Sequence, residues 1–472
     1  MTSCELYDYI VIGAGVAGIT VALSLAKSGK QVLLVEQGSL IKPEKLPNNI
    51  LDSMHKIWLG RQPISTLGSN PISIIAGSCV GGSSVISGMI LHKIPEYTLS
   101  KIFHVFPNLS EYFSKKNIRK HEEDIHIDLG ATQGISKEKI FFETYFKKNP
   151  EYTPMVRAIN SCRNAGLCIV GCPNNQKNSF LNYLIKEKVD SLNLISDCRV
   201  EKILIKNKSA YGIIIKDSNG LNKSIHSRKG VLVTAGVLGS PNILKASGIA
   251  NKNIGKFFSC NLGASGIAIY PDHRTKFEGD AMGLESFRVL KNGQKVKIAG
   301  QFTPKSIILS RLTDSHRVGT LSQSKNYSAW TSLLPSSSYG RIFRFPITGK
   351  PIVKFSISSV DKQNLIESLK MIRHECFKNG AIEFLSLLNG TPLDKVNVSE
   401  KINVGATHIF GGCIWGDQKE NSVVNAKLQV HEHHNLYVCD ASVFPEALGI
   451  NPIIAISAFS RQLALNLIND EI

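Results

Sequence analysis

The stretch Tyr9-Ile10-Val11-Ile12-Gly13-Ala14-Gly15-Val16-Ala17-Gly18 decides the fold of this chain. It joins a short apolar run, which predicts a buried strand, to a segment of helical character that continues to Ser28. The first glycine of such a turn permits the tight bend, the second lets the backbone approach a pyrophosphate, and the third packs helix against strand. The N-terminus of the helix would then face the anion.

A second predicted strand, Gln31–Glu36, completes a βαβ pattern. Glu36 ends this strand, 18 residues after Gly18, where an acidic side chain accepts hydrogen bonds from a ribose 2′-hydroxyl. Strand, helix and acid in this register predict a Rossmann-type dinucleotide site. A free 2′-hydroxyl favours FAD or NAD over NADP, and the glycine motif does not choose between those two.

The chain has 472 residues, more than the roughly 250–300 at which a single core stops growing, so we expect more than one domain. Apolar strand patterns return after residue 190, a helix is expected from about Pro241, and residues 361–379 form one clear helix in a region of strands and Ser-rich turns. The predicted class is α/β with an α+β substrate part built on a β-sheet. The predicted units are a discontinuous dinucleotide-binding domain (1–100, 190–265 and 400–472), a Cys-containing cap segment (100–190) and an inserted substrate domain (265–400).

The formal net charge is +18, but the basic residues are spread along the chain without a nucleic-acid motif. This indicates a solvated basic surface rather than nucleic-acid binding, and leaves weak association with anionic membrane surfaces open. No apolar run approaches the roughly 18 residues that span a bilayer. A strand begins almost at the N-terminus, which leaves no room for a signal peptide, so we expect a cytoplasmic protein. Ten cysteines in such a chain do not indicate a disulfide framework.

Three further motifs lie in the middle and at the end of the chain. They are Gly77-Ser78-Cys79-Val80-Gly81-Gly82-Ser83-Ser84, Ser240-Pro241-x-Ile243-Leu244-x-x-Ser247-Gly248-Ile249, and His408-x-x-Gly411-Gly412-Cys413 followed by Asn435-Leu436-Tyr437-Val438-x-Asp440-Ala441-Ser442 and Asn451-Pro452. Together with the first glycine motif they resemble the glucose–methanol–choline (GMC) oxidoreductases. The third motif is most similar to the cholesterol oxidase and sugar dehydrogenase branch.

The resemblance implies FAD as the cofactor. It implies a non-covalent flavin, because Ile86 stands where family members with a histidyl–flavin bond carry histidine. Pro452 would occupy the first turn of the final helix with Asn451 as its cap. The residues that the resemblance and the glycine motif place at the cofactor are Gly13, Gly15, Gly18, Glu36, Gly81, Gly82, Ser83, Ser84, Val200, Asp440, Ala441, Asn451 and Pro452.

The resemblance also implies oxidation of a CH–OH group of a small organic alcohol, by hydride transfer to flavin N5. His408 holds the place of the family's active-site base and Asn451 that of its partner, 43 residues later. Imidazole suits this task because its pKa is poised near neutral pH. A non-redox FAD-containing lyase of the same fold is the alternative. The substrate, the oligomeric state and the electron acceptor (oxygen, a quinone or a redox protein) stay open.

Two clusters could bind metal. The run Cys162-x5-Cys168-x3-Cys172-Pro173 resembles a ferredoxin motif and the trinuclear cluster site of sugar dehydrogenases in the family, so an iron–sulfur cluster is one interpretation. A Cys-rich turn without a cluster is the other. His431-Glu432-His433-His434 falls between two predicted strands, which favours a surface turn over a metal site.

Overall fold

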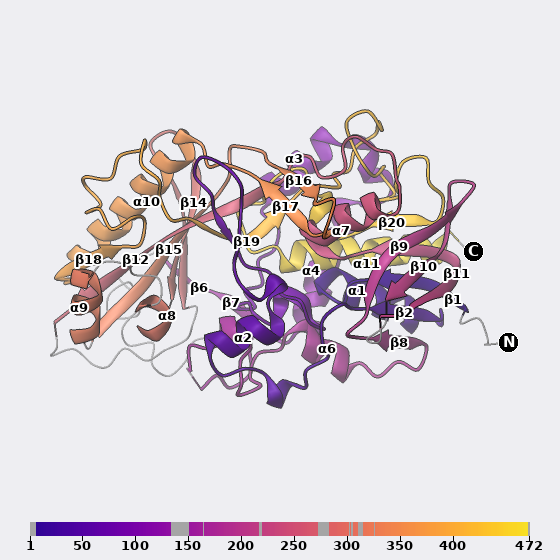
Figure 1. Cartoon of the computed structure of the whole chain (residues 1–472). Coiled ribbons are helices and arrows are strands. Elements are labelled where there is room, and N and C mark those ends of the chain that lie inside the picture. The colour runs from indigo at the N-terminus through magenta and orange to yellow at the C-terminus, as the bar shows by residue number, and fades with distance from the viewer. Residues whose placement is uncertain are drawn as a thin grey trace.

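The computed structural model describes residues 6–133, 151–163, 165–216, 220–271, 283–301, 303, 305–309, 315–324 and 326–470. Two large β-sheets organise this part of the chain and lie side by side (Figure 1). Strands of the first sheet are on the right of the view and strands of the second are on the left. Among the described residues, no helix has both the length and the apolar character to cross a bilayer.

The first sheet is built around the predicted βαβ unit. Its strand order is β8-β2-β1-β11-β10-β9, and β20 pairs with β11. Strands β1, β2, β8 and β20 run parallel to the second half of β11, whereas β9 and β10 extend the first half as antiparallel hairpins. Strand β2 is buried along its whole length, which explains its continuous apolar sequence. The bounds are β1 (Leu6–Ile12), β2 (Val32–Val35), β8 (Leu192–Ile195), β9 (Arg199–Lys206), β10 (Ser209–Lys216), β11 (Asn222–Val233) and β20 (Leu436–Val438).

Helix α1 (Val16–Lys27) follows β1 as the sequence predicted, and it packs against the final helix α11 (Ile453–Asn469). Helix α4 (Lys115–Asp128) also packs against α11. Helix α7 begins at Gly236 and ends at Ala246, so the expected start at about Pro241 is wrong. The helix starts earlier because the Asp440 carboxylate accepts a hydrogen bond from the Gly236 N–H (2.8 Å) and so holds the first turn there.

The second sheet has the order β3-β4-β19-β12-β15-β14-β13-β6, with β18 paired to β12. Helix α10 (Ser359–Lys378) packs on β12 and β15, which confirms the predicted helix 361–379. The strand bounds are β3 (Ile64–Ser65), β4 (Ser73–Ile74), β6 (Thr153–Pro154), β12 (Ser259–Tyr270), β13 (Leu284–Val289), β14 (Lys295–Gln301), β15 (Asn326–Pro335), β18 (Glu383–Ser386) and β19 (Gly405–Phe410).

The second sheet takes strands from segments that the sequence analysis assigned to the dinucleotide domain. Strand β19 pairs with β12, and β4 pairs with β19 on its other side. Strand β19 belongs to the second sheet, and its residue His408 contacts Asn451 just before α11. Because α11 packs on α1, this contact links the second sheet to the layer that covers the first. The remaining elements are α2 (Ile50–Ile57), α3 (Glu96–Val105), α6 (Phe180–Lys186), α8 (Lys305–Leu309), α9 (Ser315–Gln323), β5 (Ala131–Gln133), β7 (Val156–Ala158), β16 (Arg341–Arg344) and β17 (Pro351–Lys354).

Candidate active site

The glycine turn after β1 has the geometry of a dinucleotide loop. Gly13 has φ +105°, a conformation that favours glycine. A Cβ on Gly18 would lie 1.8 Å from the Gly13 carbonyl oxygen, so only glycine allows α1 to approach β1 this closely. A Cβ on Gly15 would meet no atom within 4 Å. Open space therefore lies over Gly15 at the N-terminus of α1, where a pyrophosphate would be bound.

The second glycine-rich loop, residues 77–84, lies directly against the first. The Gly81 N–H donates to the Ala14 carbonyl (2.8 Å), and a Cβ on Gly82 would lie 2.9 Å from the Gly15 Cα. Ser84 is buried and its hydroxyl donates to the Gly81 carbonyl (2.6 Å). Ser83 is more exposed, and its Oγ accepts from the N–H of Gly77 (2.9 Å). The two predicted loops thus form one continuous backbone surface.

Glu36 sits at the end of β2 beside this surface. Its two carboxylate oxygens accept hydrogen bonds from the N–H groups of Ala14 and Gly38, each at 2.9 Å. Burial raises the pKa of Glu36 to about 7, although both hydrogen bonds oppose the shift. The Cys198 N–H donates to the Glu36 carbonyl (3.0 Å), which places the predicted residue Val200 on β9 two residues from this contact.

Asp440 and Ala441 follow β20, close to the N-terminus of α7. The Asp440 carboxylate accepts from the Ser240 hydroxyl (2.5 Å) and the Ser442 N–H (2.7 Å), besides Gly236. Burial raises the pKa of this carboxyl group. Ala441 accepts from the Gly411 N–H (3.2 Å), which connects the last strand to the loop after β19. Asp440 therefore fixes backbone groups near the predicted cofactor site.

His408 and Asn451 meet in space, as their predicted pairing requires. The Nε2 atom of His408 lies 3.0 Å from the side-chain nitrogen of Asn451. On the other side of the ring, Nδ1 lies 3.4 Å from the side-chain nitrogen of Asn261. Asn261 is fixed by two backbone contacts, because its Oδ1 accepts from the Gly449 N–H (3.0 Å) and its Nδ2 donates to the Ile450 carbonyl (2.8 Å).

Next to this pair lies a charged cluster that the sequence did not predict. Lys297 on β14 donates from Nζ to the Asn451 Oδ1 (2.7 Å) and pairs with Glu285 on β13 (2.9 Å). His92 binds the same carboxylate at 2.6 Å through Nε2, and its Nδ1 accepts from the Asn451 backbone N–H at 3.4 Å. Burial alone would raise the pKa of Glu285, but His92 and Lys297 outweigh it and lower the value to about 2.

Lys297 determines which way the Asn451 amide points. An ammonium group can only donate, so the amide oxygen must face Lys297 and the NH₂ group must face His408. A protonated His408 would then direct N–H groups at amide NH₂ groups on both sides. Burial first, and then the charges on Lys297 and His92, lower the pKa of His408 to about 3. The expectation of a base poised near neutral pH is wrong for this reason.

Asn451 does not cap the final helix. The helix α11 begins at Ile453 with Pro452 in the cap position, and no side chain caps it. The expected placement, with Pro452 in the first turn and Asn451 as cap, is therefore wrong by one residue. The Asn451 side chain instead contacts His408 through its nitrogen and accepts from Lys297 through its oxygen.

Of the three cysteines of the proposed cluster run, Cys168 lies close to the segment that follows loop 77–84. Cys168 is buried, and Arg157 donates to its Sγ from Nη2 (3.3 Å). Lys177 donates to the Cys168 carbonyl (2.7 Å) and to the Ser87 carbonyl (2.9 Å), which connects this turn to the segment after residue 84. Within the described ranges, no three Cys, His, Asp or Glu side chains converge as they would around one metal ion.

The histidine run 431–434 forms the turn that the sequence favoured. His431 contacts the Ser422 hydroxyl through Nε2 (2.8 Å), and the Glu432 carboxylate pairs with Lys419 (2.8 Å). The turn separates residue 430 from β20. His431 and Glu432 thus have partners within the protein.

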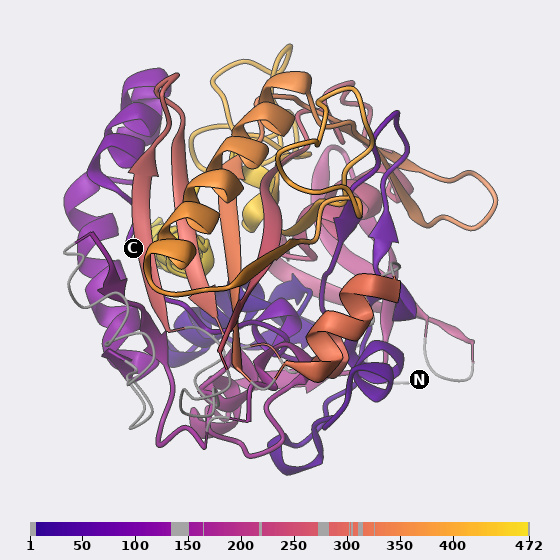
Figure 2. The same ribbon diagram turned by 90° about the vertical axis from the view of Figure 1, so that its left-hand side faces the viewer.

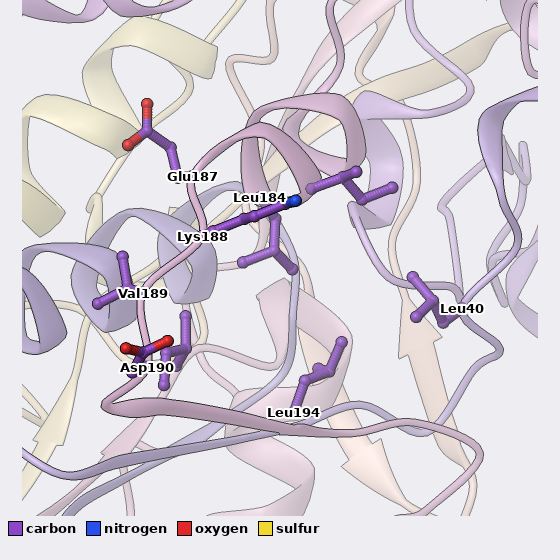
Figure 3. A pocket seen from close by; sticks show the side chains of 9 residues that line it. Leu40, Leu184, Glu187, Lys188, Val189, Asp190 and Leu194 are labelled. Carbon is purple, nitrogen blue, oxygen red and sulfur yellow. The ribbon is translucent and has the colours of Figure 1, made fainter.

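A separate hollow lies at the free edge of the first sheet, near β8 and the end of α6 (Figure 3). None of the predicted cofactor or catalytic residues lines it, so we do not assign it to the flavin or to the alcohol. Its lining residues are Leu40, Leu184, Ile185, Glu187, Lys188, Val189, Asp190, Leu192 and Leu194.

Fold and site together define a dinucleotide-binding protein with a half-buried His–Asn pair. A family model described as GMC oxidoreductase matches residues 7–262, and the model of its C-terminal part matches residues 348–460. The chain therefore belongs to the GMC oxidoreductase family and is an FAD-dependent oxidoreductase. The open space over Gly15, the adjacent loop and Glu36 fit the cofactor that this family implies.

Similar proteins extend over nearly the whole chain. An uncharacterized GMC-type oxidoreductase of Sinorhizobium fredii is 25% identical over 97% of this chain and 94% of its own length. A long-chain-alcohol oxidase of Arabidopsis thaliana is 24% identical over 96% of this chain and 65% of its own length. The chain thus spans about two thirds of the plant enzyme.

Two solved structures share the fold. A formate oxidase of Aspergillus oryzae has a TM-score of 0.78 at 15% identity, and covers 100% of this chain and 99% of its own. A pyridoxine 4-oxidase from Mesorbium loti has a TM-score of 0.74 at 14% identity, and covers 98% of this chain and 99% of its own.

Proposed function

We propose that this protein oxidises the CH–OH group of an alcohol, with His408 as the base and Asn451 as the donor that holds the substrate oxygen. The observation that carries the proposal is the 3.0 Å contact between the His408 Nε2 and the Asn451 amide nitrogen. When bound, the flavin supplies the acceptor for the hydride that leaves the alcohol carbon. The protein supplies the groups that receive the proton and stabilise the oxygen.

The chemistry of the pair follows from the direction of each group. A neutral His408 offers a lone pair on Nε2, which can accept the hydroxyl proton. Asn451 offers an N–H, which can donate to the same oxygen as it gains alkoxide character. The buried positive charge of Lys297 lies on the far side of the amide and favours that negative charge further. A substrate hydroxyl oxygen that contacts both side chains would thus give its proton to His408. The Asn451 N–H would stabilise the negative charge that develops on the same oxygen.

The positive environment also explains how a weak base can act. A base with a pKa near 3 takes a proton from an alcohol only if the alcohol is made more acidic. Lys297 and the Asn451 amide supply that effect, because both stabilise the deprotonated oxygen. We propose that the low pKa of His408 is matched by a lowered pKa of the bound alcohol.

Substrate and acceptor belong to the proposal as well. The Arabidopsis relative is named a long-chain-alcohol oxidase, and the two structural neighbours are named oxidases. We therefore favour an alcohol as substrate and oxygen as the electron acceptor. Ile86, which cannot bond to a flavin through its side chain, supports a non-covalent cofactor.

His408→Ala tests the assignment of the base. Losing a general base slows the chemistry about 10²–10⁴-fold, so we expect flavin reduction by an alcohol to slow by at least the lower value. Asn451→Ala should lose less, and the double variant should be little slower than His408→Ala because both groups act on one oxygen. The measurement is anaerobic stopped-flow reduction of the bound flavin. A His408→Ala protein that retains its yellow colour and is reduced at the normal rate would contradict the assignment.

A further inference from the structure

A basic and apolar hairpin stands out from the body of the protein. It is formed by β16 and β17, and it is the loop that extends on the right of Figure 2. Three apolar side chains follow one another at alternate positions: Phe343 is 39% exposed, Phe345 is 38% exposed, and Ile347 at the tip is 87% exposed. Phe343 and Phe345 are alternate residues of one extended arm and point to one face, whereas Ile347 lies in the turn at the tip. These apolar side chains are therefore open to solvent.

The opposite face of the hairpin anchors it to the protein. Ile342 and Val353 are directly paired, and both are buried. The Ile342 side chain reaches the loop after β19, where a Cβ on Gly412 would lie 3.1 Å from it. The exposed apolar side chains are therefore not needed to fix the hairpin. Leu67, which is 57% exposed, pairs with β17 through its N–H to the Val353 carbonyl (2.8 Å) and widens the apolar surface.

Uncompensated positive charge surrounds this apolar surface. Arg341 is directly paired with Lys354 across the hairpin, and like charges in this arrangement destabilise a strand pair. Among the described residues no carboxylate forms an ion pair with Arg341, Lys350 or Lys354. Residues 336–360 include four basic residues and no Asp or Glu.

We propose that this hairpin docks the protein on an anionic membrane surface. Phe343, Phe345 and Ile347 would enter the interfacial layer, where aromatic and aliphatic side chains are favoured beside lipid headgroups. Arg341 and Lys354 would meet anionic headgroups, which relieves their mutual repulsion. A soluble acidic partner would match these charges but would leave the projecting Ile347 without an apolar contact. The proposal does not depend on the catalytic assignments.

Sedimentation with lipid vesicles tests the proposal on the full flavin-loaded protein. We expect binding to vesicles of phosphatidylcholine and phosphatidylserine, weaker binding to phosphatidylcholine alone, and weakening by added salt. Replacing Arg341 and Lys354 by Gln should weaken binding about fivefold for each charge removed. Ile347→Ser should weaken it at least about tenfold, since burial of an Ile side chain is lost.

Matched changes elsewhere provide the controls. Ile127 on α4 is 77% exposed, and Lys116 and Lys120 are exposed on the same helix. We expect vesicle binding to stay within about twofold of the wild type in Ile127→Ser and in the double variant with Lys116→Gln and Lys120→Gln. These variants change the exposed apolar area and the net charge of the protein but leave the hairpin intact. Retained flavin absorbance and circular dichroism would show that all variants fold.

Three results would overturn the proposal. One is no binding of the wild-type protein to either vesicle. Another is equal loss in the α4 controls, which would assign binding to net charge. The third is a dimer in light scattering that the hairpin changes dissociate without affecting vesicle binding, which would assign the surface to a second copy of this chain.

Discussion

His408 carries the proposed chemistry in a ring that the protein keeps neutral. Its neighbours on both sides are amide NH₂ groups, and the charge that affects it most is the ammonium of Lys297, which binds Asn451. A neutral imidazole can accept a proton directly. Because His408 stays neutral over a wide range of pH, it is in the form that can act as a base throughout that range. The pKa near 3 predicts that protonation of His408 does not limit the reaction between about pH 5 and 8.

Lys297→Met tests this account at the level of one side chain. Methionine keeps the buried length but removes the charge and the donor, so the Asn451 amide can turn and the pKa of His408 rises, while burial, the larger cause, still holds it below its ordinary value. Protonated His408 cannot act as base, so the pH at which activity falls on acidification should be higher in the variant than in the wild type. At neutral pH we expect flavin reduction to slow by about tenfold to a hundredfold.

Two further variants separate this role from a structural one. Lys297→Met leaves the Glu285 carboxylate short of a partner, so the double variant with Glu285→Gln removes that charge and should restore folding but not rate. Lys295→Met changes an exposed lysine on the same strand and should have no effect. An unchanged rate and pH profile in Lys297→Met would show that the lysine does not position Asn451.

At this scale the sequence predicted some functional residues and not others. His408 and Asn451 lie in motifs with fixed spacing, and they do meet. Lys297 lies in the alternating run Lys295-Val296-Lys297-Ile298, which by itself predicts that both lysines face solvent. Lys297 is 1% exposed because other parts of the chain cover that face of β14. No local pattern reports such a contact.

The elements of the predicted cofactor site are the β1–α1 turn and the loop 77–84. Each was visible in the sequence because glycine is required where backbones approach closely or φ is positive. Their contact with each other was not visible, since it depends on how distant segments pack. The start of α7 and the cap of α11 were misplaced for a related reason: Asp440 and Asn451 make contacts with residues far along the chain.

A pair of alanine substitutions in α1 and its turn distinguishes ligand binding from folding. Gly15→Ala adds a Cβ in open space, so unfolding without FAD should stay within about 1 kcal/mol of the wild type. The same methyl group occupies the space for the pyrophosphate, so added FAD should no longer raise the melting temperature. Gly18→Ala forces a contact with the Gly13 carbonyl and should cost about 3 kcal/mol or more with or without FAD.

Thermal unfolding with and without FAD measures both effects. Equal FAD stabilisation in Gly15→Ala and wild type would show that the cofactor does not approach this turn. An undisturbed Gly18→Ala would show that the close packing of α1 on β1 is not required.

On the scale of the whole molecule, the site belongs to both sheets. His408 and Lys297 come from the second sheet, whereas Asn451 leads into α11, which packs on α1 of the first. Composition and motif order predicted an α/β fold with a discontinuous dinucleotide domain, but they could not show that β19 completes the second sheet. That pairing joins residues about 150 positions apart, and only tertiary packing selects it.

The metal content of the complete protein tests the iron–sulfur interpretation of Cys162, Cys168 and Cys172. The structure speaks against this interpretation, because no three potential ligand side chains converge among the described residues. We therefore expect near-zero iron and acid-labile sulfide after anaerobic purification, and a thiol turn with Cys168 beside Arg157 and Lys177. Iron and sulfide in fixed proportion to flavin, and lost in Cys168→Ser, would contradict this expectation.

Anaerobic mixing of the purified yellow protein with a panel of alcohols tests the central claim most directly. We expect at least one alcohol to bleach the flavin absorbance, and air to restore it. In His408→Ala, bleaching by the same alcohol should be at least about a hundredfold slower. A flavin that stays oxidised in every alcohol while the protein cleaves a cyanohydrin would contradict the account, and would identify a lyase on this fold instead.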